Sequence, residues 1–295
     1  MAGLAGPRAT RSERAGAYVL IPTFFKKIKT LHPETPSDPP VRLLTTPMGT
    51  LACTDVGAGA PVVAIHGMPG TVRDYRWLGA VVEPHLRFIR LDLPGFGASP
   101  PGLPPTRAGY VEAVLRLLDA LGLERVVLMS HSFGAGIALS VAAEAPTRVA
   151  GLALLAPTGL RPNRGMGRFP VPPRVLEGVL ATPGLGRLLG RRLEPGFRAM
   201  GFRCTEAEAR RSITTVARWK WAENRKAARA VRCPVLGAWT DDDHAVEPEI
   251  VQELLSHLPA GPRLHFATGG HNLQKSHAHE VGAALVEWVG SLKGL

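Results

Sequence analysis

Hydrophobic residues in the first half of the chain follow two patterns in alternation. Short apolar runs, typical of strands buried on both faces of a parallel sheet, occupy residues 61–65, 87–91, 126–129 and 149–156. Apolar residues at helical spacing lie between these runs, in residues 71–84 and 111–121. Strands that alternate with helices in this way form right-handed βαβ units. The pattern therefore predicts an α/β fold with a mostly parallel central sheet flanked by helices.

The alternation stops after residue 157. The next stretch is helix-like and rich in Arg, Gly, Pro and Leu, without a strand that the pattern supports. Strands resume at residues 233–239 and 262–266, and an amphipathic helix at 277–292 closes the chain. A helical insertion between strands of one sheet favours a lid over the edge where open α/β sheets bind ligands. We therefore predict an α/β core of residues 41–157 and 230–295, with an inserted helical cap of residues 158–229.

Two different segments precede the buried strands. Residues 41–46 and 50–56 flank a turn with Pro47 and Gly49 and predict an antiparallel hairpin. Residues 1–40 form an N-terminal extension whose brief apolar stretch ends in lysines rather than in a small-residue cleavage site, which disfavours a signal peptide. We expect this extension to be partly disordered. The alternative is a short amphipathic helix that rests on the domain or on a membrane surface.

Composition and charge limit the classes of protein. A chain of 295 residues with 45% hydrophobic content can form one large domain with an insertion. No apolar run approaches the roughly 18 residues of a membrane span. The net charge of +11 could attract anionic partners, but the cations are spread along the chain without an aromatic-interleaved basic block, so we predict no nucleic-acid partner. The sequence does not indicate an oligomeric state.

Three cysteines, Cys53, Cys204 and Cys233, lie far apart in the sequence. Their spacing matches neither a zinc site nor a redox pair. Free thiols are typical of a reducing compartment, so we expect a cytoplasmic location and no metal.

Residues 126–136 read Val-Val-Leu-Met-Ser-His-Ser-Phe-Gly-Ala-Gly and predict a strand, a very tight turn and the start of a helix. The residues two before and two after the central serine of such a turn must be small, because the backbone folds back on itself. Ser130 and Gly134 meet this demand around Ser132. The Ser132 hydroxyl would then lie at a helix N-terminus, where free N–H groups stabilise negative charge. The segment resembles the G-x-S-x-G nucleophile elbow of the α/β-hydrolase family, with Ser130 in place of the first glycine.

Members of this family activate the serine with a histidine that a carboxylate orients, in the chain order Ser, Asp or Glu, His. The loop at residues 240–248 resembles the family's acid segment, with Thr240 in place of a glycine and one extra residue before the proline. The register of that segment assigns the carboxylate to Asp243, with Asp242 as the fallback. Gly269-Gly270-His271 follows the last strand and resembles the family's G-G-H segment, which assigns the base to His271.

Two further segments extend the resemblance to about residues 41–292. His66-Gly67-Met68-Pro69-Gly70 resembles the family's oxyanion loop, so the backbone N–H groups of Met68 and Phe133 are assigned to the oxyanion hole. The segment 92–99 is similar to a D-x-x-G-x-G-x-S segment of the superfamily, and we interpret it as structural support near the site. Its glycines lack the spacing of a dinucleotide-binding loop.

The resemblance implies a serine hydrolase that cleaves carboxylic esters of small molecules through an acyl-enzyme, without a metal or organic cofactor. Carbon–carbon bond hydrolases, proline iminopeptidases, thioesterases and acyltransferases of the same family stay open as alternatives, as does a non-catalytic binding protein. Ser132 argues against epoxide hydrolases and haloalkane dehalogenases, whose elbow carries a carboxylate. Residues 160–203 hold nine arginines against two acids, which favours a solvated cap surface or, alternatively, a preference for anionic substrates.

Overall fold

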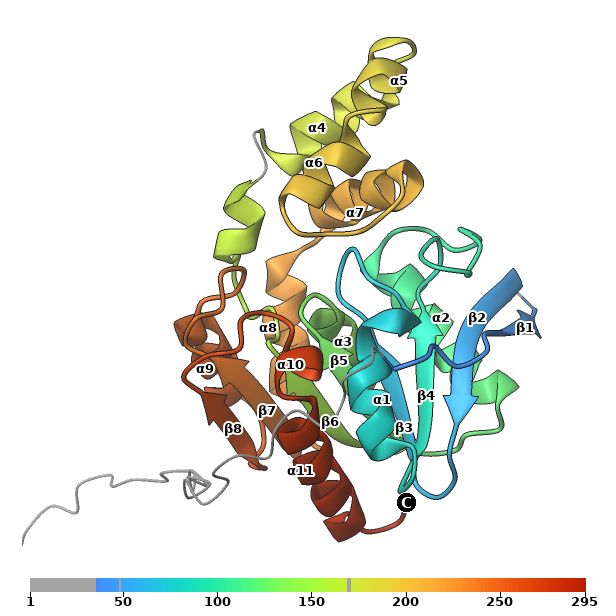
Figure 1. Ribbon diagram of the computed structural model, residues 1–295, viewed down its shortest axis with the longest axis vertical. Coiled ribbons are helices and arrows are strands. Elements are labelled where there is room, and N and C mark those ends of the chain that lie inside the picture. Colours follow the sequence, from blue (N-terminus) through green and yellow to red (C-terminus); the bar gives the residue numbers. More distant parts are fainter. Residues whose placement is uncertain (1–35, 48, 169–170) are drawn as a thin grey trace, which may run out of the picture.

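The computed structural model describes residues 36–47, 49–168 and 171–295. An eight-stranded sheet in the order β1-β2-β4-β3-β5-β6-β7-β8 forms its centre (Figure 1). The β1–β2 and β2–β4 pairs are antiparallel, and the remaining pairs are parallel. The strands are Arg42–Thr46 (β1), Gly49–Val56 (β2), Pro61–Ile65 (β3), Arg87–Asp92 (β4), Val126–His131 (β5), Val149–Leu155 (β6), Val235–Thr240 (β7) and Arg263–Phe266 (β8). The predicted mostly parallel sheet and the hairpin at its edge are confirmed.

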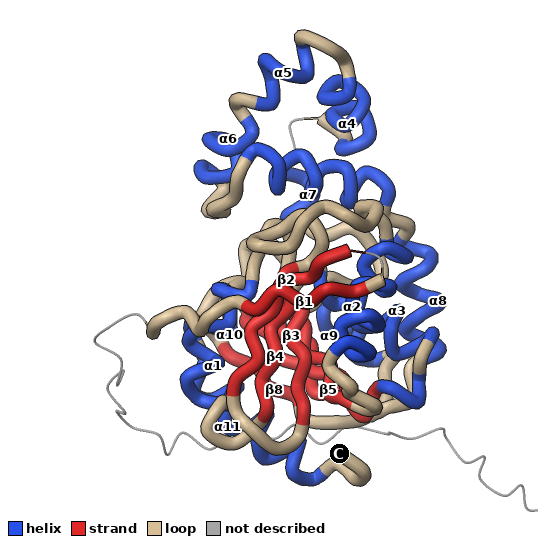
Figure 2. Tube along the Cα trace, turned by 90° about the vertical axis from the view of Figure 1, so that its right-hand side faces the viewer, coloured by secondary structure: helices blue, strands red, loops and turns tan. Residues whose placement is uncertain are grey.

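Helices cover both faces of this sheet (Figures 1 and 2). The first face packs against Arg76–Val82 (α1), Leu273–Ser276 (α10) and Ala278–Ser291 (α11). The second packs against Arg107–Ala120 (α2), Gly134–Glu144 (α3), Trp221–Ala230 (α8) and Pro248–Ser256 (α9). The central strand β5 is buried along its whole length, which explains its continuous apolar run.

A helical insertion separates β6 from β7. It contains Arg164–Arg168 (η3), Pro173–Ala181 (α4), Leu185–Gly190 (α5), Leu193–Ala199 (α6) and Glu206–Arg218 (α7), followed by α8. Helices α4 to α7 pack together around Phe197, Ala209 and Ile213 and rise beyond one end of the sheet (Figure 1). Helix α8 packs on α3 of the core. The insertion therefore adds a separate small cluster of apolar side chains to the main core.

Some element boundaries differ from those that the sequence pattern predicts. The stretch expected as one helix at residues 71–84 is a 3-10 helix, Val72–Tyr75 (η1), followed by α1. Helix α2 begins four residues before the predicted start at Val111, because Thr106 caps it by accepting a hydrogen bond from the Gly109 N–H at 3.3 Å. A further 3-10 turn, Pro146–Arg148 (η2), joins α3 to β6.

The predictions of an N-terminal extension and of no membrane span can be compared with the structure only over the residues that it describes. Residues 1–35 of the predicted N-terminal extension lie outside the part of the chain that the structure describes. Within that part, no helix combines the length and the hydropathy needed to cross a membrane. All three cysteines are free, and Cys53, on β2, is buried in the main core.

Candidate active site

The turn between β5 and α3 holds Ser132 in an unusual backbone conformation. Its φ is +52°, in the left-handed region that few residues other than glycine adopt. The Ser132 N–H donates to the Leu155 carbonyl at 2.9 Å, and the Thr158 N–H donates to the Ser132 carbonyl at 3.1 Å, so β6 and the loop after it hold the turn. A conformation of this kind, maintained by its surroundings, is frequent at functional sites.

Gly134 is required by the close approach of α3 to β3. A Cβ atom on Gly134 would lie 2.7 Å from the Ile65 carbonyl oxygen and 2.8 Å from that of His66. Ser130, which replaces the first glycine of the elbow pattern, is fully buried in β5. Its hydroxyl has no hydrogen-bond partner among the described residues, so the structure accommodates this side chain but does not use its polarity.

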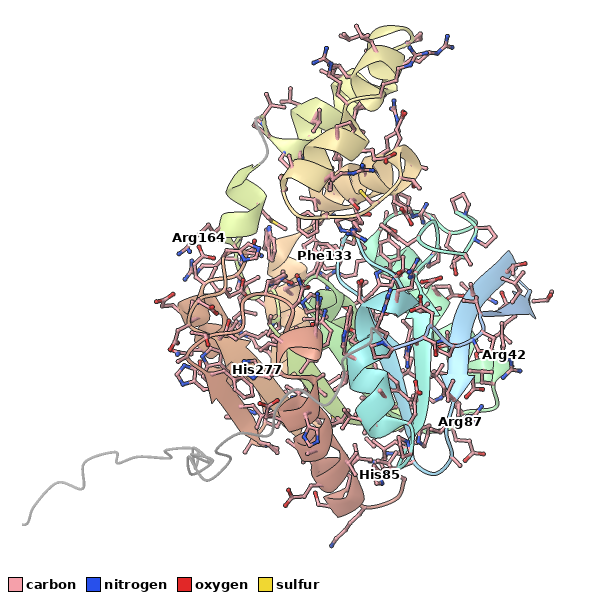
Figure 3. All side chains as sticks on the ribbon, viewed as in Figure 1. Arg42, His85, Arg87, Phe133, Arg164 and His277 are labelled. Carbon is pink, nitrogen blue, oxygen red and sulfur yellow. The ribbon has the colours of Figure 1, made fainter. Side chains whose placement is uncertain are left out.

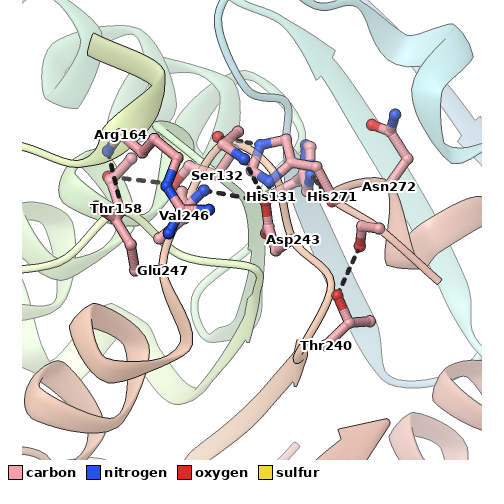
Figure 4. Close-up of polar contacts among 12 residues, drawn as sticks. His131, Ser132, Thr158, Arg164, Thr240, Asp243, Val246, Glu247, His271 and Asn272 are labelled. Carbon is pink, nitrogen blue, oxygen red and sulfur yellow. Dashed lines mark hydrogen bonds and ion pairs between the residues drawn. The ribbon is translucent and has the colours of Figure 1, made fainter. Parts of the chain in front are cut away.

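Ser132, His271 and Asp243 form one line of hydrogen bonds (Figure 4). His271 Nε2 lies 2.8 Å from Ser132 Oγ, and His271 Nδ1 lies 2.8 Å from Asp243 Oδ2. Ser132 precedes the other two residues by more than a hundred positions, and Asp243 and His271 are 28 positions apart. The three meet because β5, β7 and β8 end at the same edge of the sheet. The geometry allows Asp243 to fix the imidazole with its proton on Nδ1, which leaves the Nε2 lone pair for the serine proton.

Backbone N–H groups complete the environment of Asp243. Its second oxygen accepts hydrogen bonds from Ala245 at 2.7 Å and Val246 at 2.9 Å. Burial raises the pKa of Asp243, but the hydrogen bond and charge of His271 together with these two N–H donors outweigh burial, and the net pKa lies below its ordinary value. Asp243 is therefore a buried carboxylate that stays ionised beside the imidazole.

The other two aspartates of this loop have different partners. Asp242, the fallback for the acid, accepts hydrogen bonds from the Gly269 and Gly270 N–H groups at 3.1 and 2.7 Å. Asp241 lies 2.7 Å from His265 Nε2 on the exposed side of β8. The structure thus brings Asp243 to His271, whereas Asp242 holds the turn that precedes this histidine.

His131 is a site residue that the sequence interpretation missed. Its ring lies 4.7 Å from that of His271, and its Nε2 lies 2.8 Å from the His271 carbonyl oxygen. Burial, followed by the neighbouring His271 charge, lowers the pKa of His131 to about 3. The imidazole is therefore neutral, and it donates its Nε2 proton to the loop that carries His271. Its position directly before Ser132, at the end of a buried strand, is the sequence feature that could have indicated this role.

The two backbone groups assigned to the oxyanion hole come from neighbouring turns. Met68 and Phe133 both line the cavity that holds Ser132, and Gly67 packs against the Ser132 Cβ, where a Cβ on Gly67 would lie 3.1 Å away. Within the described chain, neither the Met68 nor the Phe133 N–H donates a hydrogen bond. Both groups are available to an oxygen bound beside Ser132.

His66 and Asp92 support the loop that contains Met68. His66 Nε2 accepts a hydrogen bond from the Leu93 N–H at 3.0 Å, so its Nδ1 carries the proton and donates to the Gly67 carbonyl at 2.6 Å. Asp92, which is also buried, accepts from the N–H groups of Val72 at 2.7 Å and Ala98 at 2.9 Å. The segment after β4 therefore supports the site structurally.

A cavity of about 780 Å³ opens above Ser132. Its walls come from the core and from the insertion between β6 and β7, which contributes apolar side chains that include Phe197, Met200 and Val216. Phe133 lies under this insertion (Figure 3), with its ring 4.4 Å from that of Trp219. Among the described residues, no cluster of His, Cys, Asp and Glu has the arrangement of a metal site.

The family model described as the alpha/beta hydrolase fold matches residues 60–183. The 2-hydroxy-6-oxo-2,4-heptadienoate hydrolase of Pseudomonas putida is 39% identical over 111 residues, which cover 36% of this chain and 40% of that protein. The haloalkane dehalogenase of Mesorhizobium japonicum is 26% identical over 296 residues, 86% of this chain and 94% of the relative.

Solved structures with a similar fold agree with the match to the alpha/beta hydrolase family model. An esterase from Thermogutta terrifontis superposes with a TM-score of 0.67 at 24% identity, over 85% of this chain and 98% of that protein. A likeness at this identity establishes the fold. Together with the family model over residues 60–183 and the dehalogenase relative, it shows that the chain has the α/β-hydrolase fold.

Proposed function

We propose that the protein is a serine hydrolase that cleaves carboxylic esters of small molecules. The observation that supports this function best is the continuous line of hydrogen bonds from Asp243 through His271 to Ser132, with both distances at 2.8 Å. A serine hydroxyl is a weak nucleophile unless a base removes its proton, and this line supplies the base and its orienting carboxylate. The hydroxyl also lies in a cavity of about 780 Å³, large enough for a small organic substrate.

In the first stage of the proposed mechanism, His271 Nε2 takes the proton of Ser132 as Oγ attacks the ester carbonyl. The carbonyl oxygen becomes negatively charged, and the N–H groups of Met68 and Phe133 stabilise it. His271 then gives its proton to the departing alcohol, and the acyl group stays bound to Ser132.

In the second stage, a water molecule takes the place of the alcohol. His271 removes one of its protons while the water oxygen attacks the acyl carbon. Collapse of the second oxyanion releases the carboxylic acid and returns the proton to Ser132. The ionised Asp243 stabilises the imidazolium that forms in each stage. The helices of residues 158–229 act as a cap, because Phe197 and Met200 line the cavity and limit its contact with water.

A carbon–carbon bond hydrolase is the second candidate. It is favoured by the resemblance of about a third of the chain to the 2-hydroxy-6-oxo-2,4-heptadienoate hydrolase of Pseudomonas putida. Haloalkane dehalogenation is not proposed despite the longer alignment with a dehalogenase, because displacement of a halide needs an ionised nucleophile, whereas the elbow carries the neutral hydroxyl of Ser132. A cytoplasmic location suits the three free thiols.

A fluorophosphonate probe and a panel of p-nitrophenyl esters and vinylogous diketones test the proposal. We expect the probe to label the wild-type protein and Ser132→Ala to abolish both labelling and ester hydrolysis. Asp243→Asn should slow hydrolysis by roughly 10³-fold or more, because the imidazole loses the partner that orients it. Asp241→Asn, a matched change in the same loop, should keep wild-type rates. Labelling of Ser132→Ala, or hydrolysis of the diketones but not of esters, would overturn the ester assignment.

A further inference from the structure

We infer that the cavity binds substrates with an anionic group, such as a carboxylate, held apart from the scissile carbonyl by an apolar spacer. This inference rests on the proposed hydrolytic function and specifies its substrate class. The cations that line the cavity outnumber its carboxylates. Asp74 is the acid among the lining residues, whereas the cations are Arg73, Arg76, Arg203 and Lys275. Such an excess attracts negative charge into the site.

On the core side, the cations are only partly compensated. Arg73 and Arg76 share one carboxylate, that of Asp38, at 2.9 and 3.2 Å. Lys275, on α10, lies with Nζ 4.7 Å from the centre of the Trp77 ring, and Arg76 lies 5.1 Å from the same ring. No carboxylate within the described residues pairs with Lys275. This wall therefore has the positive charge of Lys275 available to a ligand. Arg73 and Arg76 add a further positive charge, because the single carboxylate of Asp38 balances only one of the two.

On the cap side, Arg203 belongs to the cavity whereas the other cap arginines with described side chains do not line it. Several of these are committed elsewhere: Arg161 pairs with Glu253, Arg198 pairs with Glu194, and Arg174 donates to the Ala217 carbonyl. Arg203 has no carboxylate partner in the described part of the chain. The cavity thus has a cation on its cap side as well as on its core side.

Asp74 does not cancel this excess. Its carboxylate accepts a hydrogen bond from the Thr71 N–H at 3.1 Å in the capping box of η1, so it is already committed to the loop. Burial raises the pKa of Asp74, and even as a full carboxylate this single acid leaves the four cations of the cavity wall in excess.

Apolar side chains line the cavity together with Ser132 and these cations. They include Met166, Phe197, Met200, Phe202 and Val216. A cavity with an apolar wall, a nucleophile and a group of cations matches a substrate with a reactive carbonyl, a hydrocarbon spacer and a terminal anion. The net charge of +11 in the sequence therefore has a local counterpart where a substrate would bind.

The test compares p-nitrophenyl hydrogen suberate with the p-nitrophenyl ester of suberic acid monoamide, which has the same length and no charge. We expect kcat/KM at low salt to be about tenfold higher for the charged ester, and 0.5 M NaCl to reduce this preference, because exposed charges are screened. The double variant Arg203→Gln/Lys275→Gln should lower the preference at least threefold. The control Arg191→Gln/Arg192→Gln removes the same charge from exposed cap positions outside the cavity and should leave the preference unchanged.

Binding of both esters to Ser132→Ala, followed by tryptophan fluorescence, separates this inference from the catalytic proposal. Equal binding and equal hydrolysis of the two esters would overturn the inference and leave the hydrolase standing. Tighter binding of the charged ester, with no hydrolysis of either ester by the wild-type protein, would support the anion site and overturn the proposed ester hydrolysis. A preference that persists in the double variant but falls in its control would also overturn the assignment to Arg203 and Lys275.

Discussion

At the scale of single residues, His131 connects the stability of the protein to the geometry of its site. The buried imidazole holds the His271 loop through the 2.8 Å hydrogen bond from its Nε2 to the His271 carbonyl. A histidine in the unfolded chain has a pKa near 6.5, whereas burial lowers the pKa of His131 to about 3 in the folded protein. Between these values the unfolded state binds a proton that the folded state does not bind, so the free energy of unfolding falls as the pH falls.

We therefore expect His131→Gln, which keeps a neutral hydrogen-bond donor, to reduce the sensitivity of the fold to acid. Between pH 7 and pH 5, the wild-type protein should lose about 2 kcal/mol more unfolding free energy than this variant. Urea unfolding at several pH values measures the difference. His85→Gln is the control, since His85 is exposed and lies far from Phe133 (Figure 3). Parallel stability curves for wild type and His131→Gln would contradict the prediction.

Hydrogen-bond partners also explain which site residues a sequence can indicate. Three consecutive aspartates have the same chemistry, and the family register selected Asp243, which is the one that contacts His271. Its catalytic role stays a prediction until it is tested. Nothing in the pattern assigned Asp242 to the Gly269 and Gly270 N–H groups, because this contact joins loops 27 and 28 residues apart. His131 was missed for the same reason, since its partner is a backbone carbonyl 140 residues away.

At the scale of elements, the distance between α3 and β3 depends on one missing side chain. Gly134 stands where a Cβ would lie 2.7 and 2.8 Å from two carbonyl oxygens of the strand and turn before Gly67. Backbone atoms cannot move aside as the end of a flexible side chain can. The position of Ser132 at the N-terminal end of α3 is therefore sensitive to the smallest substitution at this site.

We expect Gly134→Ala to lower the unfolding free energy by about 1–3 kcal/mol, as overpacking of a core does, and to reduce hydrolysis sharply because α3 must shift. The matched change Gly178→Ala lies in α4, where no atom comes within 4 Å of the added Cβ. It should stabilise the protein by up to about 1 kcal/mol, since alanine favours a helix over glycine. Urea unfolding and ester hydrolysis measure both variants. An unchanged midpoint and rate for Gly134→Ala would refute this account of the elbow.

The sequence pattern predicted the strands that are buried on both faces. It did not predict features that depend on contacts between distant segments, such as the order of the strands. Strands such as β3 and β6 are buried on both faces, so their apolar runs identified them. The order of the strands in the sheet depends on which crossovers pack, and hydrophobic periodicity does not encode it. The helices between β6 and β7 were predicted as a region but not one by one, because α5 and α6 are only 6 and 7 residues long, too short to show a period.

At the scale of the whole molecule, α7 joins the inserted helices to the core. Its first turn contributes Glu208, which accepts a hydrogen bond from the Gly97 N–H at 2.9 Å, and Arg211 donates to the Leu103 carbonyl at 2.5 Å. One turn further on, the Thr215 and Tyr110 hydroxyl oxygens lie 2.8 Å apart, and both residues are fully buried. Helix α7 thus contacts the loop between β4 and α2 as well as the first turn of α2. These contacts attach the cap helices to the core.

The buried pair at this joint has a fixed direction. The Thr215 hydroxyl donates to the Arg211 carbonyl at 2.9 Å, so its proton is used and Tyr110 must be the donor between them. Burial raises the pKa of Tyr110, which keeps the phenol protonated for this purpose. Removing the acceptor leaves a buried O–H without a partner, which costs about 1–3 kcal/mol, whereas removing both groups costs less.

We therefore expect Thr215→Val to be more destabilising in the wild-type background than in the Tyr110→Phe background. The coupling energy from a double-mutant cycle of urea unfolding should be about 1 kcal/mol. Thr182→Val in the cap, where the Thr182 hydroxyl donates to the Val179 carbonyl at 2.7 Å, provides the reference value for a change that leaves the Tyr110–Thr215 hydrogen bond intact. A coupling energy near zero would mean that the Tyr110–Thr215 hydrogen bond does not help to hold α7, and that apolar packing and the contacts of Glu208 and Arg211 hold it instead.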